Sequence, residues 1–180
     1  MFKKITIASA ILAMSSFAYA GADVFDTEDS SSPFIGLELG GTFVQGDTDA
    51  EKSHKGKGFS VGLRLGAQNE QWRSMVMFDY YNNKTDKQKY ERALIQVDYF
   101  IMPDTFSGTQ LKPYVGINGG YANYESKGID ASGVTYGGQF GVQASVSDHI
   151  DVDLGYRYDI ARQKELGNIG NIALGVHYVY

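Results

Sequence analysis

Cysteine is absent from this chain of 180 residues, and proline occurs only three times. The lack of cysteine excludes disulfides, thiolate metal sites and cysteine nucleophiles together. Basic residues are also in deficit, because 16 Lys and Arg stand against 21 Asp and Glu, which gives a net charge of −5. That sign argues against nucleic acid as a partner. Glycine, tyrosine and phenylalanine are abundant instead, at 22, 13 and 10 residues. This composition favours a β architecture packed over glycine.

Long hydrophobic runs are missing from the chain except near its start. Residues 1–20 contain Lys3 and Lys4, then an apolar stretch, then the small-x-small sequence Ala18-Tyr19-Ala20. This order predicts a secretory signal peptide that is cleaved after residue 20. The apolar stretch is shorter than the ~20 residues that a membrane-spanning helix needs, and no comparable stretch follows it.

Eight segments of alternating polar and apolar residues follow at a regular interval, which is the pattern of half-buried strands. Longer polar connectors alternate with short turns, as in an up-and-down antiparallel barrel with its long loops at one end. The connector 103–109 is longer than this rule expects. The longer connectors are 46–57, 83–89, 125–132 and 162–167, and the short turns are 69–71 and 147–149. The predicted strands are 34–45, 58–68, 72–82, 90–102, 110–124, 133–146, 150–161 and 168–180.

The last predicted strand keeps its alternation to the end of the chain, where Tyr180 is aromatic. An unpaired strand edge invites aggregation, and pairing with the first strand removes that edge by closing a barrel. A soluble barrel has its apolar face inside, whereas a membrane barrel turns its apolar face to lipid. The alternation by itself leaves both forms open.

The choice of cation separates the two forms. Every lysine after residue 20 falls in or beside a predicted loop or turn, whereas Arg64, Arg73, Arg92 and Arg157 lie on the polar faces of strands. The planar fork of arginine suits confined pairs with carboxylates, while lysine favours open water. Many glycines lie on the same faces and leave room for long side chains. These features favour a polar lumen over the polar exterior of a soluble barrel of the lipocalin type.

Aromatic residues near the predicted strand ends support the same choice, because amphipathic rings prefer the headgroup level of a membrane. Phe34 and Trp72 lie toward the short turns, and Tyr90 and Tyr124 lie toward the long loops. We therefore expect an all-β, eight-stranded antiparallel up-and-down transmembrane β-barrel, with the soluble barrel as the alternative. The expected domains are a signal peptide (1–20), a flexible periplasmic leader (21–32) and the barrel (33–180).

The polar faces carry the charges that would line the lumen. Unpaired charge in a confined interior is costly, so we expect the arginines and carboxylates to form an ion-pair network. His177 lies on the same face and is expected to hydrogen-bond Asp151 or Asp153. The network is either a structural plug, since eight strands leave an interior that side chains can fill, or a narrow pathway for ions or small solutes. Its predicted members are Glu38, Arg64, Arg73, Asp79, Arg92, Asp98, Asp151, Asp153, Arg157 and Asp159.

The predicted loops offer a second candidate site. Asp47 and Asp49 make the first half of the first loop acidic, and Lys84, Lys87 and Lys89 make the second loop basic. Such charges either form a solvated surface or bind host or matrix surface molecules and anionic lipopolysaccharide. The two aspartates lack the full pattern of a calcium loop, so we expect no metal and no cofactor.

Three short sequences carry a family resemblance. L-K-P-Y-V-G at 111–116, G-G-Q-F-G-V at 137–142 and D-L-G-Y-R-Y at 153–158 are similar to strands of small outer-membrane β-barrel proteins of the OmpA-like and OmpX/Ail type. The resemblance implies the outer membrane of a Gram-negative bacterium as the location, with outer-membrane lipid and lipopolysaccharide as partners. It also implies recognition of the terminal strand, here Tyr178 and Tyr180, by the outer-membrane assembly machinery. The usual terminal residue in this group is Phe.

The resemblance constrains function less than fold, because such barrels include adhesins, serum-resistance factors, structural anchors and narrow channels. No serine, histidine and carboxylate converge at one depth of the predicted barrel, and no G-x-S-x-G, H-E-x-x-H or phosphate-loop motif occurs. We therefore expect a non-enzymatic, surface-exposed monomer that supports envelope integrity and mediates adhesion or host and environment interaction through its loops. A narrow channel is the alternative.

Overall fold

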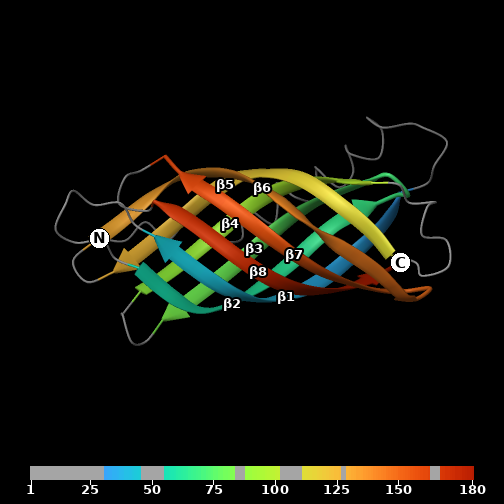
Figure 1. The fold of residues 1–180 in the computed structure, drawn as a ribbon, viewed down its shortest axis with the longest axis horizontal. Helices are drawn as coiled ribbons and strands as arrows, with labels where there is room; N and C mark the ends of the chain where they lie inside the picture. Colours follow the sequence, from blue (N-terminus) through green and yellow to red (C-terminus); the bar gives the residue numbers. More distant parts are fainter. Residues whose placement is uncertain (1–30, 46–54, 84–87, 102–110, 127–128, 163–166) are drawn as a thin grey trace. The chain divides into compact units, whose positions relative to one another are not determined.

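The computed structural model describes residues 31–45, 55–83, 88–101, 111–126, 129–162 and 167–180. They form eight antiparallel strands that cross the barrel obliquely and pair in sequence order until β8 meets β1 (Figure 1). No helix among these residues is long and apolar enough to cross a membrane. The strands are β1 (Ser32–Gln45), β2 (Lys55–Gln68), β3 (Trp72–Asn83), β4 (Gln88–Phe100), β5 (Leu111–Ser126), β6 (Ile129–Ser147), β7 (Ile150–Ala161) and β8 (Asn168–Val179).

The strand bounds follow the sequence prediction within a few residues, with one larger difference. β5 runs to Ser126 and β6 starts at Ile129, so the predicted loop 125–132 is mostly paired strand. Polar residues there break the alternation that marks a half-buried strand, but backbone pairing between two strands needs no apolar side chains. The predicted signal peptide lies outside the described residues, as does the predicted leader except for its last two positions.

The two faces of each strand are inverted relative to a soluble protein. On β1, Leu37 and Leu39 are 62% and 64% exposed, while Glu38 between them is 1% exposed. On β8, Leu174 is exposed and His177 is buried. Apolar side chains thus form the outer surface and polar side chains fill the interior, as a barrel in lipid requires. The predicted transmembrane barrel is confirmed, and the soluble form is excluded.

β1 and β8 close the barrel. They pair antiparallel from Phe34 with Val179 to Gln45 with Asn168. Next to the pair of Phe34 with Val179, the amide of Tyr180 donates to the carbonyl oxygen of Pro33 at 3.0 Å. The terminal strand therefore lies between two partners, and its backbone groups are paired within the barrel, which a hydrocarbon environment demands.

Inward-facing glycines make room for the charged side chains. A Cβ atom at Gly175 would collide with the carboxylate of Asp153 and the guanidinium group of Arg64, and one at Gly116 would collide with Asp98. The space that these glycines leave empty is therefore the space in which the lumen charges lie.

Gly120→Ala and Gly41→Ala form a matched pair that tests whether an inward position of the wall needs glycine where an outward one does not. A Cβ atom at Gly120 would collide with the carbonyl oxygen of Ala93 and lie 2.8 Å from the Cα atom of Leu94, whereas one at the outward Gly41 would have nothing within 4 Å. We expect Gly120→Ala to lower the free energy of unfolding by about 1–3 kcal/mol and Gly41→Ala to leave it unchanged. Urea unfolding of the refolded barrel measures both, and equal stability of the two variants would contradict the packing argument.

Candidate functional site

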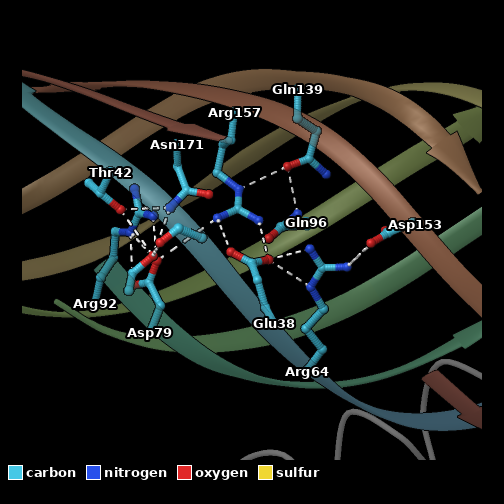
Figure 2. Close-up of polar contacts among 12 residues, drawn as sticks. Glu38, Thr42, Arg64, Asp79, Arg92, Gln96, Gln139, Asp153, Arg157 and Asn171 are labelled. Carbon is cyan, nitrogen blue, oxygen red and sulfur yellow. Dashed lines mark hydrogen bonds and ion pairs between the residues drawn. The ribbon is translucent and has the colours of Figure 1, made fainter. Parts of the chain in front are cut away.

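Glu38 of β1 lies between two arginines from the neighbouring part of the wall. Arg64 Nε of β2 donates to Glu38 Oε2 at 2.8 Å, and Arg157 Nη2 of β7 donates to the same oxygen at 3.0 Å (Figure 2). All three side chains are at most 5% exposed. Charge-assisted bonds of this kind compensate for the loss of water around each ion, provided that every charge keeps a partner.

The contacts continue toward the short turns through Asp153 of β7. Arg64 Nη1 donates to Asp153 Oδ2 at 2.8 Å, and Arg73 Nη1 of β3 donates to the same oxygen at 3.0 Å. Arg73 Nη2 also lies 2.7 Å from Asp98 Oδ2 of β4. Asp153 is therefore shared by two arginines, as Glu38 is.

The contacts continue toward the long loops through Asp79 of β3. Arg157 Nη1 lies 3.9 Å from Asp79 Oδ2, and Arg92 Nε of β4 donates to Asp79 Oδ1 at 3.0 Å. Arg92 also donates through Nη1 to Asp159 of β7. Positive and negative groups thus alternate in one line, which we call the lumen charge chain. Its order is Asp98, Arg73, Asp153, Arg64, Glu38, Arg157, Asp79, Arg92 and Asp159.

Asp151, the tenth residue of the predicted network, makes no ion pair among the described residues. The amides of Gln68 and Gln143 donate to Asp151 Oδ2 at 2.6 and 2.8 Å instead. His177 also differs from expectation, because its Nε2 atom lies 3.0 Å from Arg64 Nη1 and its contacts include no hydrogen bond to an aspartate. Asp151 pairs with His177 in the β7–β8 register, so the two residues are neighbours. The predicted hydrogen bond between them is nevertheless absent among the described residues.

The sequence places Gln96 and Gln139 on the polar faces of their strands, but the predicted network included neither them nor the aromatic side chain of Tyr114. Arg157 Nε and Gln96 Nε2 both donate to Gln139 Oε1, at 3.2 and 2.6 Å. The guanidinium group of Arg73 lies 4.6 Å from the ring centre of Tyr114, a cation–π contact. The inward parity of these residues on the predicted strands was the available signal. Parity places a side chain in the lumen but does not say which charge it meets.

An apolar layer fills the lumen on the loop side of the charge chain. Tyr81 stacks on Tyr90 with ring centres 4.9 Å apart. Tyr90 and Tyr124 are buried, so their assignment to the outer girdle is wrong, and so is that of Phe34, which contacts the ring of His177. A position near a strand end predicts how deep along the barrel axis a side chain lies. Only its odd or even place in the alternation of the strand decides whether it faces the lumen or the lipid. The layer comprises Val44, Tyr81, Tyr90, Ala122, Tyr124, Ala161 and Ile169.

Of the five predicted loop residues, Asp47, Asp49, Lys84 and Lys87 lie outside the described residues. Lys89 belongs to β4, where its Nζ atom lies 3.2 Å from Glu91 Oε1 and 5.6 Å from the ring centre of Tyr80. Within the described ranges, no group of three or more His, Asp or Glu side chains is arranged to hold a metal ion.

The two terminal tyrosines form an outward aromatic pair at the turn end. Tyr178 and Tyr180 are 48% and 69% exposed, and their rings meet edge to face with centres 5.1 Å apart. His149, in the turn between β6 and β7, stacks on Tyr178 at 5.9 Å. The pair is accessible on the outer face, and its role as an assembly signal stays a prediction.

Arg157→Met tests whether the charge chain stabilises the barrel. The substitution keeps most of the side-chain volume but leaves Glu38 and Asp79 with one guanidinium partner each, so we expect the free energy of unfolding to fall by about 3–5 kcal/mol. Lys89→Met is the control, because it removes an exposed ion pair and should cost less than about 1 kcal/mol. Both are measured by urea unfolding, and a wild-type midpoint for Arg157→Met would refute a stabilising chain.

Solved structures with the same fold include outer-membrane barrels from three genera. Neisserial surface protein A aligns with a TM-score of 0.70 and 20% identity, over 84% of this chain and 99% of that one. The N-terminal β-barrel domain of OprF from Pseudomonas aeruginosa aligns with a TM-score of 0.55 and 12% identity, over 84% and 100%. Ail, the attachment invasion locus protein of Yersinia pestis, aligns with a TM-score of 0.51 and 19% identity, over 84% and 99%. At these identities the likeness is one of fold.

The sequence itself carries the family assignment. No curated protein matches it. The family model described as the outer membrane protein beta-barrel domain, however, matches residues 6–179, which is nearly the whole chain. Together with the closed barrel and its apolar outer face, this match shows that the chain belongs to the β-barrel domain family of outer-membrane proteins.

Proposed function

We propose that the protein is a non-enzymatic, sealed scaffold of the outer membrane that supports the envelope and presents its loops for adhesion or for contact with host, matrix or environment. The proposal includes export through a cleaved signal peptide, assembly guided by Tyr178 and Tyr180, and a monomeric state. The observation that carries it is the lumen charge chain, of which Figure 2 shows the part from Asp153 to Arg92.

The way the lumen is filled supports a scaffold rather than a channel. A cavity of about 10 Å³ lies against Arg64, Arg73 and Arg157. That volume is room for roughly one water molecule. A conducting path would require these arginines to leave their carboxylates, and each separation would leave a charge unpaired in a confined interior. The apolar layer around Tyr81 and Tyr90 adds a second obstruction on the loop side.

The placement of the described histidines supports a non-enzymatic role. His177 contacts Arg64 and the ring of Phe34 inside the lumen, and His149 stacks on Tyr178 at the turn end. Both therefore lie on the turn side of the barrel. A surface enzyme would meet its substrate on the opposite side, at the long loops. Among the described residues, no serine hydroxyl group is hydrogen-bonded to His177, as activation of a serine nucleophile would require.

The rim on the loop side supports contact with lipopolysaccharide. Lys57 and Lys89 point outward there, 5.7 and 5.6 Å from the ring centres of Phe43 and Tyr80. Aromatic rings at a membrane interface with cations beside them suit a layer of anionic headgroups. The sequence adds two more positive charges, Lys84 and Lys87, between β3 and β4, and such a basic segment suits larger anionic partners on host or matrix surfaces.

Planar-bilayer recording tests the sealed lumen. We expect the refolded wild-type barrel to give no stable unitary current, because the charge chain and the apolar layer leave no continuous water path. Arg157→Ala is compared with wild type in detergent conditions where the variant remains folded. The substitution opens space beside Glu38, so a current through the lumen would be larger or altered in this variant. Stable wild-type currents that change with Arg157→Ala would make the lumen a pathway and overturn the scaffold proposal.

Adhesion assays test the loops. We expect the double variant Lys84→Glu and Lys87→Glu to reduce binding of expressing cells to laminin- and collagen-coated surfaces several-fold, because it reverses the charge of the second loop. Lys112→Glu is the control, since it makes one such charge reversal, half the charge change of the double variant, at the turn end of β5. Surface levels are equalised by antibody staining. Equal binding of both variants and wild type would rule out this loop as the adhesive surface.

A further inference from the structure

Four polar atoms that lack a hydrogen-bond partner among the described residues surround one glycine of the lumen wall. They are Asn118 Oδ1 and Nδ2, Thr135 Oγ1 and Asp159 Oδ1. Gly137 of β6 pairs with Asn118 of β5 on one side and with Asp159 of β7 on the other, and Thr135 precedes it by two positions on the same inward face. Asn118 is 8% exposed, and Thr135 and Asp159 are fully buried. Buried polar groups are rarely left without a hydrogen-bond partner, so this grouping is a candidate ligand-binding site.

Gly137 forms the floor of the grouping. A Cβ atom there would collide with the carbonyl oxygen of Tyr158 and lie 2.5 Å from Asp159 Oδ1, so this carboxylate oxygen lies over the glycine. The other oxygen of Asp159 is engaged by Arg92. Neighbouring strands are about 4.8 Å apart, which separates Asn118 and Asp159 by about 10 Å at the backbone. The register thus places the two residues on either side of a glycine, and Thr135 lies on the same inward face two positions away.

The charge of the lumen gives the sign of the ligand. Among the described residues, six carboxylates are buried in the lumen against four arginines. The lumen charge chain begins and ends on an aspartate, and Asp151 is held only by amides. A surplus of negative charge in a confined interior is costly unless a positive group compensates for it. Asp159, with one oxygen free of partners, is the place where such a group would fit.

We propose that this grouping is a binding site for one monovalent cation of the sodium class, coordinated by Asp159 Oδ1, Asn118 Oδ1 and Thr135 Oγ1 above Gly137. Oxygen ligands suit a hard cation, and calcium or magnesium would need more carboxylate charge than one shared oxygen supplies. Arg92 beside Asp159 also disfavours a doubly charged ion. The bound ion would offset part of the negative surplus and give a partner to three oxygen atoms that otherwise lack one. This inference goes beyond the proposed function and is independent of it.

Melting of the detergent-refolded barrel in sodium chloride and in N-methyl-D-glucamine chloride, at equal ionic strength, tests the site. We expect sodium to raise the melting temperature saturably, by roughly 4 °C at ten times its dissociation constant, because it binds only the folded state. Thr135→Val keeps the shape of the side chain but removes its oxygen, and Asn118→Leu removes the amide. Both variants are expected to lose the sodium-specific rise. Asp151→Asn is the control that removes a lumen carboxylate elsewhere, and it should keep the rise.

Each outcome decides the matter. A sodium-specific rise that disappears in Thr135→Val and persists in Asp151→Asn supports the site. Equal melting in the two salts overturns it and leaves a water molecule or a proton as the partner of Asp159. A rise that persists in Thr135→Val shows that sodium acts elsewhere and overturns the assignment.

Discussion

The pairing of four arginines inside a closed wall is the interaction on which the rest of the structure depends. Eight strands leave an interior that side chains must fill, and a guanidinium group placed there needs a carboxylate within reach. Arg64, Arg73, Arg92 and Arg157 each contact two carboxylates, so the pairs join into a line instead of remaining separate. The inward glycines follow from this line, because a larger side chain at Gly116 or Gly175 would collide with it.

The apolar exterior and the charged interior are two consequences of one constraint on the strands. Each strand has two faces, and lipid accepts only the apolar one, so every polar side chain of the spanning part must turn inward. The interior then becomes dense with charge, and amide groups such as those of Gln96 and Gln139 link the ions laterally. The aromatic stack of Tyr81 on Tyr90 separates this polar region from the loops. The lumen is therefore layered along the barrel axis, with the ion pairs in the middle and the stacked aromatic rings at the loop end.

The sequence predicted the barrel because a period of two residues is visible in a single chain. The placement of lysine in loops and of arginine on the polar faces then separated the membrane form from the soluble one. Nine of the ten lumen residues lie in the charge chain for the same reason, since parity alone puts Glu38 and Arg64 inside. The tenth, Asp151, accepts hydrogen bonds from amides instead, because the strand register, and not the alternation of faces, decides which side chains are in contact. Tyr90 and Tyr124 were assigned to the wrong side because depth was used where parity was needed. The continuation of β5 and β6 past residue 124 was missed, since backbone pairing leaves no periodic mark on polar side chains.

The alternating order of the charge chain also determines which of its residues can be substituted without leaving like charges side by side. The line has carboxylates at both ends, so every arginine is interior and every terminal residue is an acid. Removal of Asp98 or Asp159 shortens the line and leaves as many acids as bases in what remains. Removal of any arginine instead brings two acids face to face in the middle. Substitution at either end of the line therefore disrupts fewer charge pairs than substitution of an arginine.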